Sequence, residues 1–268
     1  MNAIIKDQVV LAEEGFYEPK LLETEYFKKY RESYYYAKQV GLLSPYRNYL
    51  RLLNLFSEIN GYNKEHAASY SKRIRAAPTD WNGCEAIIAE MIVYWSYIRL
   101  ENEELIKSIS LDQDECDLIV ERRDGSKYFL EVFSINPSFE TKVTNEPVVH
   151  DIKTHTQTAF SSVRQKLLNK ARKQGQFSKL RENYAVVELN HPSIANEFTI
   201  LSSLSEGYKV HFNLNTGKST HEGYDWSKSV FDSPELKFLK GVIWFCMGAY
   251  EYRKILVNSN FGKQITKS

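Results

Sequence analysis

The chain has 268 residues, of which 43% are hydrophobic; this is enough for one large domain, or for a core with a smaller appendage, and excludes a disordered chain. Its 35 Lys and Arg residues balance 34 Asp and Glu residues, so the net charge of +1 does not itself indicate nucleic-acid binding. Three scattered cysteines without a CxxC pair, no signal-peptide pattern and no apolar run longer than residues 241–250 predict a cytoplasmic protein without a disulfide framework, zinc knuckle or membrane span.

Residues 1–80 are expected to form an N-terminal helical region, because they are rich in Tyr, Lys, Glu and Leu and contain few helix breakers. Hydrophobic periodicity predicts amphipathic helices over residues 21–40 and 45–59. The aromatic run at residues 34–38 favours packing against the rest of the protein over stacking with bases. Pro, Asp, Asn and Gly at residues 76–83 predict a loop, which we take as the boundary with a core over residues 81–268.

The core is predicted to alternate helices and strands, which is typical of a mixed α/β protein. Its first helix, over residues 84–100, is expected to begin at an Asn82 cap, with Glu85 completing a capping box. The sequence then predicts two strands joined by a tight turn, a long basic helix, a third strand, another helix and two final strands that could form a hairpin, in the ranges 116–134, 151–181, 184–190, 194–205, 241–249 and 254–260.

The strand pair within residues 116–134 carries one acid on each strand, Asp117 and Glu131. Alternate residues of a strand share a face, so the turn decides whether the two acids meet. A two-residue turn at 124–125 would set Asp117 opposite Val132, with the acids on opposite faces. A three-residue loop at 123–125 would set Asp117 opposite Glu131.

We prefer the three-residue loop because it requires a left-handed residue in last place, where Gly125 stands. It also pairs Glu121 with Lys127, which have opposite charges. Two carboxylates that face each other among apolar neighbours repel, so one keeps its proton or a cation lies between them; Mg²⁺ or Mn²⁺ would suit such oxygen donors. The alternative is an exposed strand end on which both acids are solvated.

A third carboxylate, Glu90, stands on the helix over residues 84–100. Its neighbours three and four positions away are Ala86, Ile87, Val93 and Tyr94, so Glu90 interrupts an apolar stripe. A glutamate there is unexpected without a partner, which makes it a candidate site residue. The competing interpretation places Glu90 at the edge of the stripe, in contact with water.

Over residues 81–260 these features resemble the PD-(D/E)XK nuclease superfamily, which has the restriction-endonuclease-like fold. The likeness consists of a helix with Glu90, a strand with Asp117, a return strand with Glu131, a helix carrying Lys and Gln, and a further strand. It implies a mixed central sheet flanked by helices and a Mg²⁺-dependent (or Mn²⁺-dependent) endonuclease. The resemblance implies that the three acids bind metal and act in catalysis.

The sequence departs from the family pattern at Phe133, which stands where a lysine two residues after the second acid usually assists the attacking water. Some members of the family supply the basic group from the following helix. Here Lys166 and Lys170 lie on one ridge of that helix, and we expect Lys166, or failing that Lys170, to reach the acids. The competing interpretations are a solvated basic face or phosphate contacts without catalysis.

The same helix is a candidate nucleic-acid-binding face, because basic residues are dense over residues 164–181. The expected phosphate contacts are made by Arg164, Lys170, Arg172 and Lys173, and DNA is the expected substrate in preference to RNA. One alternative is a catalytically inactive nucleic-acid-binding or scaffold protein of the same fold. Another is an unrelated α/β binding protein with structural acids. Assembly as a homodimer or with a partner protein stays open.

Overall fold

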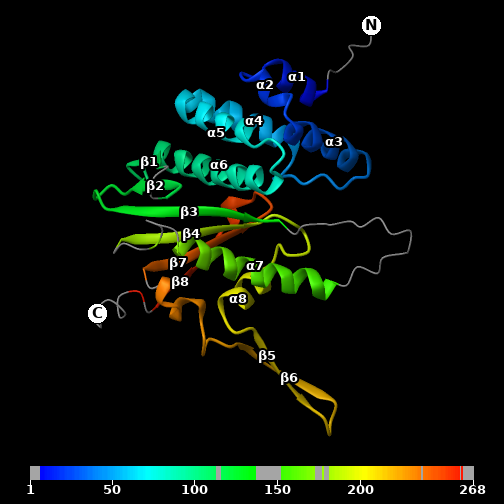
Figure 1. The fold of residues 1–268 in the computed structure, drawn as a ribbon, viewed down its shortest axis with the longest axis vertical. Coiled ribbons are helices and arrows are strands. Elements are labelled where there is room, and N and C mark those ends of the chain that lie inside the picture. The colour runs from blue at the N-terminus through cyan, green and yellow to red at the C-terminus, as the bar shows by residue number, and fades with distance from the viewer. Residues whose placement is uncertain are drawn as a thin grey trace.

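The computed structural model describes residues 7–112, 116–136, 152–172, 177, 181–236, 238–259 and 261; for residues 152–161 and 221–222 it describes the backbone. Within these ranges the protein is α/β, with a mixed six-stranded sheet in the order β1-β2-β3-β4-β7-β8 and a separate two-stranded sheet, β5-β6. Helices lie on both faces of the larger sheet, as Figure 1 shows. Within the described ranges, no helix has the length and apolar character needed to cross a membrane.

The N-terminal part of the chain forms successive helices that stack above the sheet (Figure 1). They are α1 (Gln8–Glu14), α2 (Pro19–Leu22), α3 (Glu25–Gln39), α4 (Tyr49–Tyr62), α5 (Lys64–Ala76) and α6 (Trp81–Asn102). The helix predicted over residues 21–40 is broken in the structure, because the Thr24 side chain accepts a hydrogen bond from Phe27 N and begins α3. The helix predicted over residues 45–59 begins later, after the Asn48 cap.

The predicted start of the α6 helix is wrong. Asp80 caps α6, since its Oδ1 accepts a hydrogen bond from Gly83 N at 3.0 Å. Asn82 therefore lies inside the first turn, and Glu85 is a buried residue of the helix rather than a member of a capping box. The sequence alone could not separate the two candidates, because Asp and Asn are about equally good caps.

The six-stranded sheet combines antiparallel edges with a parallel centre. Its strands are β1 (Ser108–Leu111), β2 (Leu118–Glu121), β3 (Lys127–Ile135), β4 (Glu182–Leu189), β7 (Leu239–Cys246) and β8 (Lys254–Val257). β3, β4 and β7 run parallel, whereas β1-β2-β3 and β7-β8 are antiparallel. The predicted hairpin near the C-terminal end is therefore confirmed as β7-β8, while β1 was not predicted.

The predicted register of the β2-β3 hairpin is confirmed. Glu121 pairs with Lys127, and Gly125 has a φ of 82°, the left-handed conformation that the three-residue loop requires. The regular pairing ends at Leu118 and Leu130, and just before it Asp117 N donates a hydrogen bond to the Leu130 carbonyl oxygen at 3.2 Å. The Lys170 ammonium group pairs with Glu131 and lies 4.0 Å from Asp117 Oδ2, so the two acids lie near each other.

Two buried clusters, one on each face of the sheet, hold the helices in place. On one face, Leu118, Val120, Leu130 and Val132 pack in a cluster that also contains residues of α6 and the helices above it. On the other, Phe133 packs with Val163 and Leu167 of α7 (Ile152–Arg172) and with residues of α8 (Glu197–Leu204). The long basic helix was predicted to reach about residue 181, whereas α7 spans Ile152–Arg172, Phe177 has a left-handed φ of 55°, and β4 begins at Glu182.

The chain between α8 and β7 holds further elements that were not predicted. A hairpin of β5 (Tyr208–Asn213) and β6 (Lys218–Tyr224) projects away from the sheet, as Figure 1 shows. Short 3₁₀ segments follow at Val230–Asp232 and Pro234–Leu236, and a third, Tyr250–Tyr252, lies between β7 and β8.

Candidate active site at the Asp117–Glu131 hairpin

Asp117 and Glu131 differ in exposure although both lie near Lys170. Glu131 is 2% exposed, whereas the Asp117 side chain, just before β2, is 23% exposed. Val132 N donates a hydrogen bond to Asp117 Oδ2 at 2.7 Å, which fixes the Asp117 carboxylate against β3. The site thus contains one buried acid and one acid that solvent can reach.

Lys170 is the cation that approaches both acids. Its ammonium group forms an ion pair with Glu131 Oε1 and lies 4.0 Å from Asp117 Oδ2. The same nitrogen lies 5.8 Å from the centroid of the Phe133 ring. The basic group therefore comes from α7, and Phe133, in the position where the resembled family usually has its lysine, packs beside it.

Lys166, the residue preferred from the sequence, does not take this position. Its ammonium group donates to the Ser134 carbonyl oxygen at 2.7 Å, further along β3. The reason is the direction of α7 relative to β3: from Lys166 to Lys170 the helix runs back along the strand, from Ser134 toward Glu131. Burial and the charge of Lys170 lower the pKa of Lys166.

The electrostatics of Glu131 are those of a crowded carboxylate site. The pKa of Glu131 is raised to about 7: burial is the largest cause, the Asp117 charge acts in the same direction, and Lys170 opposes both. A glutamate with a pKa near 7 can exchange a proton with its surroundings near neutral pH, which is a property of many catalytic groups.

Glu90 lies on α6 but is held by a residue from another helix. Arg73 of α5 donates two hydrogen bonds to its carboxylate, at 2.8 and 2.7 Å. Glu90 is 3% exposed, and burial raises its pKa to about 7 while Arg73 opposes the shift. The expectation that Glu90 has a partner is therefore met, but by a cation. No sequence signal pointed to Arg73, because the pairing joins two helices.

The metal-binding set expected from the sequence is only partly assembled. Among the residues that the structure describes, no three His, Cys, Asp or Glu side chains come together in a group that could hold a metal ion. Asp117 and Glu131 lie close to the same ammonium group, and carboxylates suit a hard, oxygen-seeking ion. Glu90 pairs with Arg73 instead.

The predicted nucleic-acid contacts do not form one exposed stripe. Lys170 points to the acids, Arg172 contacts Glu235 at 3.3 Å, and an Arg164 nitrogen lies 3.5 Å from the Ser205 carbonyl oxygen. Lys173, the fourth predicted contact, lies outside the described residues. Arg172, with a side chain 57% exposed, is the most accessible of the three described side chains.

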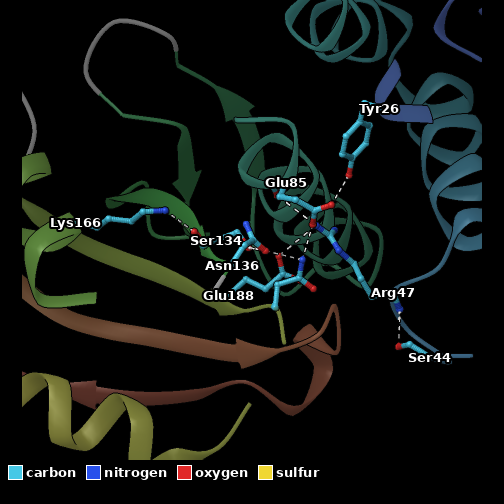
Figure 2. A network of polar contacts seen from close by, with 9 residues as sticks. Tyr26, Ser44, Arg47, Glu85, Ser134, Asn136, Lys166 and Glu188 are labelled. Carbon is cyan, nitrogen blue, oxygen red and sulfur yellow. Dashed lines mark hydrogen bonds and ion pairs between the residues drawn. The ribbon is translucent and has the colours of Figure 1, made fainter. Parts of the chain in front are cut away.

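A second buried polar network, drawn in Figure 2, was missed by sequence reasoning. Arg47 lies 2.5 Å from Glu85 Oε2 and 3.5 Å from Glu188 Oε2, and Tyr26 donates to Glu85 at 2.6 Å. Burial raises the pKa of Glu188 to about 7, against the effect of Arg47. The network joins the N-terminal helices to the sheet; its available signal was the acid of YAVVEL, Glu188, which stands in an otherwise apolar strand.

Comparison of the chain with family models, curated proteins and solved structures finds no match. The order of elements that carries the resemblance is present in the structure: a helix with Glu90, a hairpin with an acid beside each strand or on it, a basic helix and a strand. Membership of the PD-(D/E)XK superfamily stays a prediction from these residues.

Proposed function

We propose that this protein is a metal-dependent nuclease that hydrolyses phosphodiester bonds, with DNA as the expected substrate. The observation that carries the proposal is the position of Lys170, whose ammonium group approaches both Asp117 and Glu131 from α7. Two neighbouring carboxylates and a lysine supply the charges that this chemistry requires. The resembled family has a lysine at the site of Phe133, and here another element supplies it.

Asp117 and Glu131 would hold the metal ion, which when bound supplies an activated water and relieves charge on the phosphate. The solvent-accessible Asp117 carboxylate is fixed by Val132 N, so one oxygen is held against the backbone while solvent can reach the group. Glu131, with a pKa of about 7, can bind or release a proton at neutral pH. Glu90 and Arg73 act at a distance, by setting the charge beside Asp117.

Lys170 has two roles in this proposal. Without a metal ion, its ammonium group offsets the repulsion between the two acids. With substrate bound, the same group is placed to stabilise negative charge that develops on the phosphate, an effect worth about 10²–10³ in rate for one donor in other enzymes. The Phe133 ring lies 5.8 Å from the ammonium group, so it covers one side of that group.

The second candidate function is a catalytically inactive nucleic-acid-binding or scaffold protein of the same fold. One observation favours it: Lys170 and Arg73 already pair with Glu131 and Glu90, so the carboxylates are partly neutralised by the protein itself. In this alternative the lysine replaces the metal ion as the cation between the acids.

A cleavage assay separates the two functions. Single- and double-stranded DNA and RNA are incubated with the protein and Mg²⁺ or Mn²⁺, beside the Asp117→Asn and Lys170→Met variants. Lys127→Met is the matched control, because Lys127 lies on the same strand as Glu131 but its charge faces Glu121 at the far end of the hairpin. The nuclease proposal requires cleavage by wild type and Lys127→Met and its loss in the other two variants. Equal product in all four, or none with wild type on any substrate, contradicts it.

A further inference from the structure

A pocket of about 510 Å³ lies on the sheet face opposite Lys170, beneath the C-terminal part of α6. Tyr128 of β3 lines it, and Tyr128 and Glu131 point to opposite faces because they are three residues apart in one strand. The pocket volume falls within the range of about 300–1,000 Å³ that is common for sites of drug-sized ligands. It is far too large for a single inorganic anion.

Aromatic rings form the inner wall of this pocket. The Tyr128 ring centroid lies 6.2 Å from that of Tyr97 and 5.9 Å from that of Tyr184. Gly241 of β7 leaves room for the Tyr184 ring, since a Cβ there would meet a ring carbon at 3.4 Å and the Leu256 carbonyl oxygen at 2.7 Å. The wall therefore offers ring faces and edges to a planar aromatic group.

Two arginines border the rings, and none of the described lining residues is acidic. Arg122 stacks on Tyr128 at 4.5 Å and pairs with Glu182 outside the lining at 2.5 Å. Arg253 is exposed and stacks on the ring of Tyr250 at 4.8 Å. Its guanidinium donates a hydrogen bond to the Tyr250 carbonyl oxygen at 3.4 Å and, among the residues that the structure describes, pairs with no carboxylate, so its charge is available to a ligand. Burial raises the pKa of Tyr128, which keeps its hydroxyl protonated and able to donate.

We propose that this pocket binds a nucleotide, with the base against Tyr128 and Tyr184 and the phosphate at Arg253. A phosphate monoester carries a charge near −2 at neutral pH, and guanidinium groups match its geometry. Base stacking on aromatic rings supplies the rest of the recognition. The same chemistry comes from two sources, a free mononucleotide or the 5′-phosphorylated end of a single strand. The proposal does not rest on the carboxylate site, which lies on the other face.

Calorimetric titration of the full chain in EDTA tests this site without catalysis. The probes are adenosine 5′-monophosphate, adenosine, inorganic phosphate and a 5′-phosphorylated single-stranded DNA tetramer. Arg253→Met is expected to weaken nucleotide binding by about tenfold or more, because it removes a charge-assisted contact to the phosphate. Tyr128→Leu should weaken it similarly while Tyr128→Phe retains the ring. Arg75→Met is the control, because Arg75 lies in α5, outside the pocket.

The outcomes identify the source or overturn the site. Binding of the monophosphate equal to or tighter than that of the tetramer identifies a free nucleotide, and tetramer binding at least about tenfold tighter identifies a strand end. No binding of either probe overturns the proposal. Undiminished nucleotide binding by the folded Arg253→Met and Tyr128→Leu variants also overturns it. So does an affinity for inorganic phosphate or for adenosine that equals the affinity for the monophosphate. Asp117→Asn should bind the nucleotide as tightly as wild type does. The titration can therefore be interpreted even if the nuclease proposal fails.

Discussion

The Lys170 ammonium group lies 5.8 Å from the centroid of the Phe133 ring while it pairs with Glu131. Phe133, an uncharged residue of β3, and Lys170, a charged residue of α7, are therefore neighbours in space. This contact shows how Lys170 of α7 can place a positive charge near the acids, which the Phe133 side chain cannot do. It also connects the hairpin, the helix and both carboxylates in one arrangement whose parts can be tested separately.

The hairpin turn is the first test, because it fixes the pairing of β2 with β3, next to both acids. Gly125→Ala places a side chain at a φ of 82°, so the free energy of unfolding should fall by about 1–2 kcal/mol. Denaturant unfolding measures the change. Gly61→Ala in α4 is the matched control, because a Cβ there meets nothing within 4 Å and alanine favours a helix. Equal or greater stability of Gly125→Ala would refute the assigned turn.

This turn was predictable from the sequence because its determinants are local: the glycine position and the pairing of Glu121 with Lys127. The choice between Lys166 and Lys170 was not, since it depends on where α7 docks along β3, and both lysines share one ridge. Nor was the ion pair of Glu90, which requires α5 to lie against α6. The sequence therefore identifies the acids, whereas tertiary packing decides which cation meets each of them.

Metal binding should stabilise the folded protein. Millimolar Mn²⁺ should raise the melting temperature of wild type, because a ligand that binds only the native state shifts the folding equilibrium. Asp117→Asn should lose this response. Lys170→Met should retain or increase it, since it removes the cation that competes for Glu131. Thermal scans with and without Mn²⁺ provide the measurement, and a wild-type melting temperature unchanged by the ion would contradict a metal site.

The pairing of Arg73 with Glu90 should contribute strongly to stability. Arg73→Met leaves a carboxylate that is 3% exposed without its bidentate partner, so the free energy of unfolding should fall by about 3–5 kcal/mol. Glu90→Gln in the same chain should recover part of the loss, because it removes the unpaired charge. A double-mutant cycle measures the coupling. Additive losses in the cycle would show that the two residues do not interact.

The buried network in Figure 2 predicts a pH dependence of stability. The folded-state pKa of Glu188 is about 7, above the ordinary value of 4.5, so protonation favours the folded state. The stabilising contribution is therefore fully present below about pH 4.5 and lost as the pH rises through about 7. At about 1.4 kcal/mol for each pKa unit, its size is of order 3 kcal/mol.

Glu188→Gln should remove this part of the pH dependence. Unfolding free energies measured between about pH 4 and pH 8 should fall less steeply with rising pH in the variant than in wild type. Glu32 is exposed, so Glu32→Gln serves as the control for the loss of one carboxylate. Parallel pH profiles for wild type and Glu188→Gln would contradict the raised pKa.

Single-turnover cleavage in Mg²⁺ by wild type, Lys170→Met and Lys166→Met shows whether Lys170 is the basic group of a metal-dependent nuclease. We expect cleavage by wild type, a loss of about 10²-fold or more in Lys170→Met, and a much smaller loss in Lys166→Met, because the Lys166 ammonium group bonds to Ser134. Circular dichroism and the Mn²⁺ thermal shift confirm that each variant is folded and binds metal. Cleavage by folded, metal-binding Lys170→Met at the wild-type rate would contradict the account.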